Sequence, residues 1–176
     1  MNQLTSAKSG PLSGNITVPG DKSISHRSLI MGTLAVGESK ISGLLEGEDV
    51  LDTADALKVL GADIYKDHNG QWHVHGVGIG GLKEPDHPLD MGNSGTGVRL
   101  MMGLVATHPI SVTFTGDASL STRPMKRVTD PLSGFGTTFE GNEDGTLPIP
   151  TVLFFDDNDE ILSIAHNADQ AKIVLE

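Results

Sequence analysis

The segment Gly20–Ser28, GDKSISHRS, places a lysine, an arginine and several hydroxyls where a helix is expected to begin. Lys22 supplies a point charge, and Arg27 supplies a forked guanidinium that matches a phosphate or a carboxylate. Ser23 and Ser25 add hydroxyls, and the exposed N–H groups of a helix start also favour an anion. The segment therefore indicates a site for a small anion, although an ordinary N-cap with solvated bases would explain the same residues.

Two further segments combine glycines or hydroxyls with bases. In MGNSGTGVR, residues 91–99, three glycines allow backbone N–H groups to approach a ligand closely. In STRPMKR, residues 121–127, three bases occur within five residues. The four arginines of the chain all lie in these three segments, which favours one composite anion site. A glycine-rich turn and a solvated basic face are the alternative explanations. The arginines are Arg27, Arg99, Arg123 and Arg127.

The whole chain is acidic, with 12 Lys+Arg against 23 Asp+Glu and a formal net charge of −11. Nucleic acid and anionic membranes are therefore unsuitable partners, because both require a basic surface. The chain contains no cysteine, which excludes disulfides and fits a cytoplasmic location. No secretory signal and no apolar run of about 20 residues is present. We expect small anionic partners, with no cofactor and no metal.

The elements that must position these segments repeat along the chain. HRSLIMGTLAVGESKISG and VRLMMGLVATHPISVTFTG both predict a helix, a glycine turn and a short strand. Each is followed by a second predicted helix and by a hairpin, with turns at Asn69-Gly70 and Asp144-Gly145. The second helix of the later copy is expected to have Ser121 as its N-cap and to stop at Gly136. We predict complete copies over residues 20–81 and 91–149 and a partial third copy over 150–176.

Three blocks carry a resemblance to a known family: PGDKSISHRSLIMGTLAVGESKISGLLEGEDVLDTADALKVLGA, GNSGTGVRLMMGLV and STRPMKRVTDPLSGFG. They resemble 3-phosphoshikimate 1-carboxyvinyltransferase, or EPSP synthase. This family transfers the enolpyruvyl group of phosphoenolpyruvate to shikimate 3-phosphate and releases phosphate, a step toward chorismate and the aromatic amino acids. The resemblance implies an α/β fold of the inside-out barrel type, with two lobes of three repeated units and a cleft between them.

The resemblance also implies roles for individual residues. Lys22 would contact both substrates, and Ser23 and Arg27 would hold shikimate 3-phosphate. Gly95 and Arg123 would hold phosphoenolpyruvate. A glycine at position 95 also implies sensitivity to the herbicide glyphosate, because in this family an added methyl group there excludes the inhibitor.

From Pro150 onward the sequence departs from the family pattern, and only Gln170 is carried over as a further residue for shikimate 3-phosphate. The family's general base and its remaining phosphoenolpyruvate-binding arginines belong to the second lobe, so no catalytic residue is assigned. Residues 1–19 are expected to pair with that lobe, which a separate chain could supply. We therefore expect a truncated first lobe over residues 20–176 that has no turnover alone.

Two other interpretations remain open. One is a lobe similar to UDP-N-acetylglucosamine 1-carboxyvinyltransferase, which belongs to the same superfamily. Its match is weaker because the first and third segments suit a compact phosphorylated ring, and the cysteine of most of that family is absent. The other is an anion-binding module without catalytic chemistry.

Overall fold

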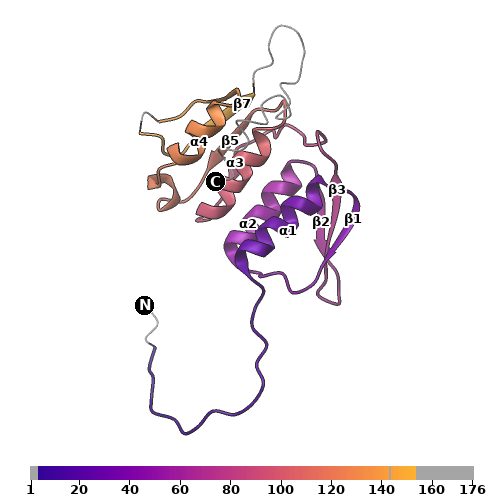
Figure 1. The fold of residues 1–176 in the computed structure, drawn as a ribbon, viewed down its shortest axis with the longest axis vertical. Coiled ribbons are helices and arrows are strands. Elements are labelled where there is room, and N and C mark those ends of the chain that lie inside the picture. Colours follow the sequence, from indigo (N-terminus) through magenta and orange to yellow (C-terminus); the bar gives the residue numbers. More distant parts are fainter. Residues whose placement is uncertain (1–3, 143, 154–176) are drawn as a thin grey trace.

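The computed structural model describes residues 4–142 and 144–153, which form two α/β units in series (Figure 1). The elements of the first unit are α1 (Lys22–Leu34), β1 (Val36–Ile41), α2 (Glu48–Val59), β2 (Asp63–Lys66) and β3 (Trp72–Val77). Those of the second unit are β4 (Leu89–Asp90), α3 (Gly95–Val105), β5 (Val112–Thr115), the short 3-10 helix η1 (Leu120–Thr122), α4 (Lys126–Ser133), β6 (Thr137–Phe139) and β7 (Ile149–Leu153).

The two sheets share one strand order. The first sheet is β1-β3-β2, and the second contains β5-β7-β6, with all of these pairs antiparallel. The second sheet has one additional strand, β4, which pairs in parallel with β5. The matching order places the starts of α1 and α3 at equivalent points of the two units, and the number of repeated units stays a prediction.

Close contact between α1 and the first sheet depends on two glycines. A Cβ at Gly32 of α1 would lie 3.2 Å from the side chain of Val74 in β3. A Cβ at Gly76 would collide with carbonyl oxygens of the last turn of α1. Because neither residue has a side chain, the helix backbone can approach the strand closely.

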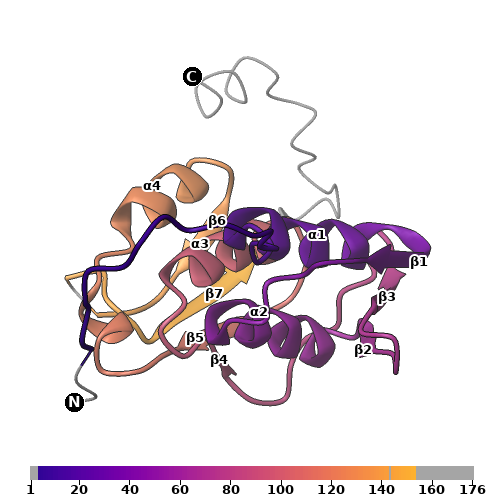
Figure 2. The ribbon, with the colours of Figure 1, turned by 90° about the horizontal axis from the view of Figure 1, so that it is seen from below.

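The helices α1, α2 and α3 pack against one another (Figure 2). One hydrophobic core runs through both units. In α2 the buried residues follow helical periodicity, and in α3 buried side chains cover most of the circumference. The largest fully buried apolar side chains come from both units: Leu29, Leu57, Leu60, Leu89, Met91, Met101, Met102, Phe114, Leu120 and Met125.

Several boundaries differ from the sequence prediction. Ser121 lies inside η1 rather than at an N-cap, because Pro124 separates it from α4, whose N-cap is Met125. The helix α4 contains Pro131 and ends at Ser133, three residues before the predicted stop. The strand β7 continues to Leu153, although the second copy was expected to end at 149. The predicted partial third copy otherwise lies outside the described residues.

Residues 4–19 form no helix or strand and extend away from both units (Figure 1). This segment exposes apolar side chains almost completely: Leu4, Leu12 and Ile16 are at least 90% exposed. The predicted pairing of residues 1–19 with a second lobe stays a prediction.

Candidate functional site

The first cationic group lies at the start of α1. The Asp21 side chain accepts a hydrogen bond from the Ile24 N–H at 2.8 Å and caps the helix. Lys22 follows directly, and its ammonium forms an ion pair with Asp49 of α2. Arg27, one turn further along, donates from Nη1 to the Ser23 carbonyl oxygen at 2.9 Å. Lys22, Ser23 and Arg27 are all exposed at this helix start, where they are accessible to an anion.

Ser25 does not join this group, contrary to the sequence prediction. Its side chain is buried, and its hydroxyl donates to the Asp21 carbonyl oxygen at 2.8 Å. The Ser25 hydroxyl oxygen also accepts a hydrogen bond from the Leu45 N–H at 3.0 Å. The hydroxyl therefore ties the start of α1 to the segment before α2 instead of facing a ligand.

The second cationic group surrounds Gly95, the first residue of α3. A Cβ at Gly95 would lie 2.6 Å from Arg123 Nη1 and 3.2 Å from Arg99 Nη1. Arg99 also donates to the Gly95 carbonyl oxygen at 2.7 Å. The structure thus brings Gly95 and Arg123 together, as the resemblance implied, at a helix terminus that itself attracts anions.

The arginines around Gly95 have no acidic partner. Within the described residues, none of the four arginines forms an ion pair with a carboxylate. Burial lowers the pKa of Arg99, and the nearby Arg127 and Arg123 charges lower that pKa further. Arg99 Nε is also buried without a hydrogen-bond partner among these residues. Such an uncompensated positive cluster in an acidic protein would be stabilised by a bound anion.

A buried contact connects the two groups. The ring of His26 in α1 is fully buried, and its Nδ1 lies 2.9 Å from the hydroxyl of Thr53 in α2. That hydroxyl would in turn lie 2.7 Å from a Cβ at Gly97 in α3. Burial lowers the pKa of His26, which favours the neutral ring. The helices that carry Lys22 and Gly95 are therefore held at a fixed separation.

Lys126 is not part of the Gly95 cluster, although the sequence places it beside Arg127. Its aliphatic chain covers Gly145, where a Cβ would lie 2.6 Å from Lys126 Cγ. Lys126 also lines a hollow of about 160 Å³ between α4 and the β6–β7 hairpin. Gln170, the remaining predicted substrate-binding residue, lies outside the described residues.

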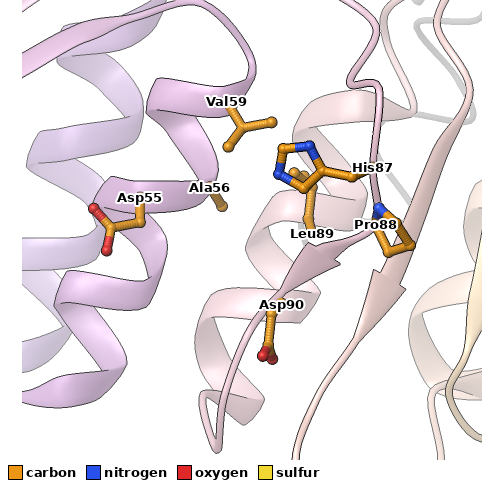
Figure 3. Close-up of a pocket in the computed structure, with 7 residues that line it drawn as sticks. All are labelled: Asp55, Ala56, Val59, His87, Pro88, Leu89 and Asp90. Carbon is orange, nitrogen blue, oxygen red and sulfur yellow. The ribbon is translucent and has the colours of Figure 1, made fainter.

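A separate hollow of about 190 Å³ lies between α2 and the segment leading into β4 (Figure 3). It is lined by Asp55, Ala56, Val59, His87, Pro88, Leu89 and Asp90. None of the predicted substrate-binding residues lines it.

Within residues 4–142 and 144–153, no group of three or more metal-binding side chains is arranged to hold an ion. No helix in the same ranges has the length and apolarity needed to cross a bilayer.

Comparisons with known proteins identify the family of the chain. The model of the EPSP synthase family, 3-phosphoshikimate 1-carboxyvinyltransferase, matches residues 6–154. The chain is 65% identical over 148 residues to the 3-phosphoshikimate 1-carboxyvinyltransferase of Parvibaculum lavamentivorans, covering 84% of this chain and 33% of the relative. It is 64% identical over 146 residues to the Dinoroseobacter shibae protein of the same name, covering 83% of this chain and 32% of that relative.

A solved structure of EPSP synthase from Acinetobacter baumannii matches with a TM-score of 0.75 and 46% identity, covering 79% of this chain and 32% of the solved chain. The chain therefore belongs to the EPSP synthase family, which confirms the resemblance drawn from the sequence. It spans about a third of the length of the curated relatives that it matches.

Four polar residues of this region escaped the sequence analysis. Asp49 pairs with Lys22, whereas Asn93, Asp117 and Ser119 surround Arg123. Asn93 belongs to the glycine-rich segment MGNSGTGVR, but its contact with Arg123 was not predicted. The acidic start EGED of the second helix, only some 25 residues after the lysine, was the one signal that could have indicated the Lys22–Asp49 pair.

Proposed function

We propose that this chain forms part of the first lobe of an EPSP synthase and holds the phosphorylated substrates of enolpyruvyl transfer. In this reaction the 5-hydroxyl group of shikimate 3-phosphate loses its proton as its oxygen bonds to C2 of phosphoenolpyruvate, while the methylene carbon takes up a proton and the C=C double bond becomes single. Loss of a proton from that carbon and departure of phosphate from the tetrahedral intermediate then give 5-enolpyruvylshikimate 3-phosphate. Both substrates are small anions, which suits cationic side chains at two helix starts.

The observation that carries the proposal is the arrangement at Gly95. Arg123 and Arg99 approach a glycine at the start of α3, and neither pairs with a carboxylate in the described structure. We assign phosphoenolpyruvate to this group, with Gly95 allowing the Arg123 guanidinium to lie close to the helix start. We assign the phosphate of shikimate 3-phosphate to Ser23 and Arg27, with Lys22 between the two substrates. Binding would replace Asp49 as a partner of the lysine.

The catalytic acid and base are assigned to the second lobe, which residues 4–19 would join through their exposed apolar side chains. Enzymes gain much of their rate by holding reacting groups in position, so a lobe without these groups binds but does not convert its substrates. We therefore expect no sustained phosphate release when the 176 residues alone are mixed with both substrates. Sustained release that is abolished in Lys22→Ala would contradict this part of the proposal.

Isothermal titration with shikimate 3-phosphate tests the binding assignment. We expect binding by the unmodified chain and an affinity loss of about tenfold or more in Lys22→Ala and in Arg27→Ala, since each removes a charged hydrogen bond. Lys58→Ala is the matched control, because Lys58 pairs with Asp55 on the exposed side of α2. Absence of binding, or equal losses in all three variants, would contradict the proposal.

A purely anion-binding module predicts the same titration but a different second result. Adding the remaining two thirds of a relative as a separate chain should restore phosphate release if this chain is part of an enzyme. A complex that forms and binds both substrates without turnover would instead support a binding module.

A further inference from the structure

The guanidinium of Arg123 is held in place by neutral oxygen atoms. Its Nη2 donates to Asn93 Oδ1 at 2.5 Å and to Ser119 Oγ at 3.1 Å. A neutral amide and a hydroxyl are weak constraints on a half-buried arginine, because the side chain loses rotamer freedom when it is fixed. Whatever fixes Asn93 therefore decides how well Arg123 is positioned over Gly95.

Asp117 fixes Asn93 from the opposite side. Its Oδ2 accepts a hydrogen bond from Asn93 Nδ2 at 2.6 Å. Its Oδ1 accepts from the Leu120 N–H at 2.7 Å, which anchors η1, and its own N–H donates to the Gly92 carbonyl oxygen at 2.8 Å. One residue thus joins the glycine-rich loop before α3 to the segment that carries Arg123.

The order of donors and acceptors along the hydrogen bonds from Asp117 through Asn93 to Arg123 has a direct chemical consequence. An ionised carboxylate can only accept hydrogen bonds, so it selects the NH₂ end of the Asn93 amide. The carbonyl end must then face Arg123, which can only donate. The carboxylate therefore orients the arginine through a neutral amide and leaves the guanidinium without a direct ionic partner.

We propose that Asp117 is a positioning residue that holds Arg123 over Gly95 through the amide of Asn93, so that the guanidinium stays available to the phosphate or carboxylate of phosphoenolpyruvate. This inference rests on the proposed function for the identity of the anion, but the Asp117–Asn93–Arg123 chain itself does not depend on any ligand. It adds Asp117, which touches no substrate in this arrangement, to the residues on which substrate binding depends.

Asp117→Asn is the sharpest variant, because its Oδ1 can still accept from the Leu120 N–H while its NH₂ group faces that of Asn93. Two opposed donors force the Asn93 amide to turn, and its NH₂ end then faces Arg123. Asp86→Asn is the matched control: it removes one negative charge from an exposed carboxyl group that, within the described residues, pairs with His87. Thermal unfolding of both variants checks that each remains folded.

The first measurement uses ¹⁵N NMR of the arginine side chains, with the Arg123 signals assigned by their loss in Arg123→Lys. In the unmodified chain we expect slow guanidinium rotation and separate Nη signals for Arg123. In folded Asp117→Asn these signals should average, whereas Asp86→Asn should leave them unchanged. Unchanged Arg123 signals in folded Asp117→Asn would overturn the proposal.

The second measurement is a titration with phosphoenolpyruvate in the presence of shikimate 3-phosphate. We expect about a tenfold weaker affinity in Asp117→Asn and no change in Asp86→Asn, as for the loss of one charged hydrogen bond. If the unmodified chain binds neither compound, the proposed function fails, while the NMR result still decides the role of Asp117. If it binds phosphoenolpyruvate equally well in all variants, the positioning role is overturned.

The double variant Asn93→Asp with Asp117→Asn separates positioning from charge. The carboxylate would now stand at position 93, accept from the new amide at 117 and pair directly with Arg123. We expect the separate Arg123 signals to return, because the guanidinium is held again, but affinity to stay low because its charge is neutralised. Recovery of affinity in this variant would show that rigidity alone matters and would overturn the proposed reason for the neutral link.

Discussion

Arg123 lies over Gly95 so closely that a Cβ at position 95 would be 2.6 Å from the arginine Nη1. The helix α3 begins at this glycine, and its N-cap Ser94 accepts a hydrogen bond from the Gly97 N–H at 3.1 Å. The absence of a side chain at position 95 therefore lets the Arg123 guanidinium approach the start of the helix closely. This guanidinium is the group assigned to phosphoenolpyruvate.

Gly95→Ala should weaken phosphoenolpyruvate binding without unfolding the chain. The new methyl group would push aside the flexible end of Arg123, which costs little stability but removes the close approach. We expect an affinity loss of about tenfold, measured by titration with shikimate 3-phosphate present. Gly103→Ala in the same helix is the control, because no atom lies within 4 Å of its Cβ position. It should stabilise by about 0.5–1 kcal/mol and leave affinity unchanged. Equal affinity losses in both variants would contradict the role of Gly95.

Gly97→Ala should have the opposite pattern, with a large effect on stability. Its Cβ would collide with Ser94 Oγ and lie 2.7 Å from Thr53 Oγ1 and 3.2 Å from Met91 Cε. All three are buried, so the core cannot yield easily, and we expect destabilisation by about 1–3 kcal/mol. Urea unfolding measures this change, again with Gly103→Ala as control. Unchanged stability would mean that the α2–α3 junction is looser than these contacts indicate.

The glycines illustrate how far sequence reasoning extends. The motif MGNSGTGVR was sufficient to predict a close backbone approach, and the repeat was sufficient to predict equivalent helix starts. The sequence motif could not distinguish Gly95, which faces a guanidinium, from Gly97, which faces a buried hydroxyl. That difference depends on residues from α2 and from the segment before α4. The contacts of Thr53 and Arg123 arise only once the helices are packed.

The outer face of the first sheet contains a pH-dependent contact. The ring of His73 in β3 forms two hydrogen bonds with carboxylates. Its Nδ1 lies 2.6 Å from Glu38 Oε1, and its Nε2 lies 3.3 Å from Asp67 Oδ2. Hydrogen bonding to Glu38, followed by that to Asp67, raises the pKa of His73, and both carboxyl groups have lowered pKa values. The same face carries Tyr65, which stacks on His73 with ring centroids 4.9 Å apart. The other titratable groups on it are Lys40, Asp63 and His75.

This contact predicts a loss of stability as the pH rises. Because the folded pKa of His73 lies above its ordinary value of 6.5, the protonated ring stabilises the fold fully below that pH and less as the pH rises through the folded pKa. Urea unfolding across neutral pH should therefore give a larger difference between the unmodified chain and His73→Gln on the acidic side. A difference that grows on the alkaline side would contradict the two-carboxylate arrangement.

His26 should show the reverse dependence. Burial lowers its pKa below 6.5, so the neutral ring is the stable form, and stability falls as the pH drops below that value. His26→Asn, which can still hydrogen-bond to Thr53, should reduce this acid-side loss in urea unfolding. If His26→Asn and His73→Gln changed the pH profile in the same direction, one of the two assignments would be wrong.

The polar details near the site were less accessible from the sequence than the cations were. Ser121 was predicted as an N-cap because serine often caps helices. Pro124 separates it from α4, which begins only at Lys126. Ser25 looked like a ligand-binding hydroxyl, but the segment before α2 uses it. Lys22 and Arg27 could be proposed from their spacing alone, since a helix start fixes their positions. The carboxylate and amide groups that contact these cations belong to segments far away in the sequence. A local sequence pattern cannot predict how such segments pack together.

The central claim is that cations at equivalent helix starts of the two units form one place for phosphorylated anions in an acidic protein. Its most direct test is a titration with shikimate 3-phosphate and then phosphoenolpyruvate, followed by ¹⁵N NMR of the Lys22, Arg27 and Arg123 side chains. We predict that the first compound shifts Lys22 and Arg27 with a single dissociation constant, and that the second then shifts Lys22 and Arg123 together. Independent responses of these side chains, or none at all, would contradict the account.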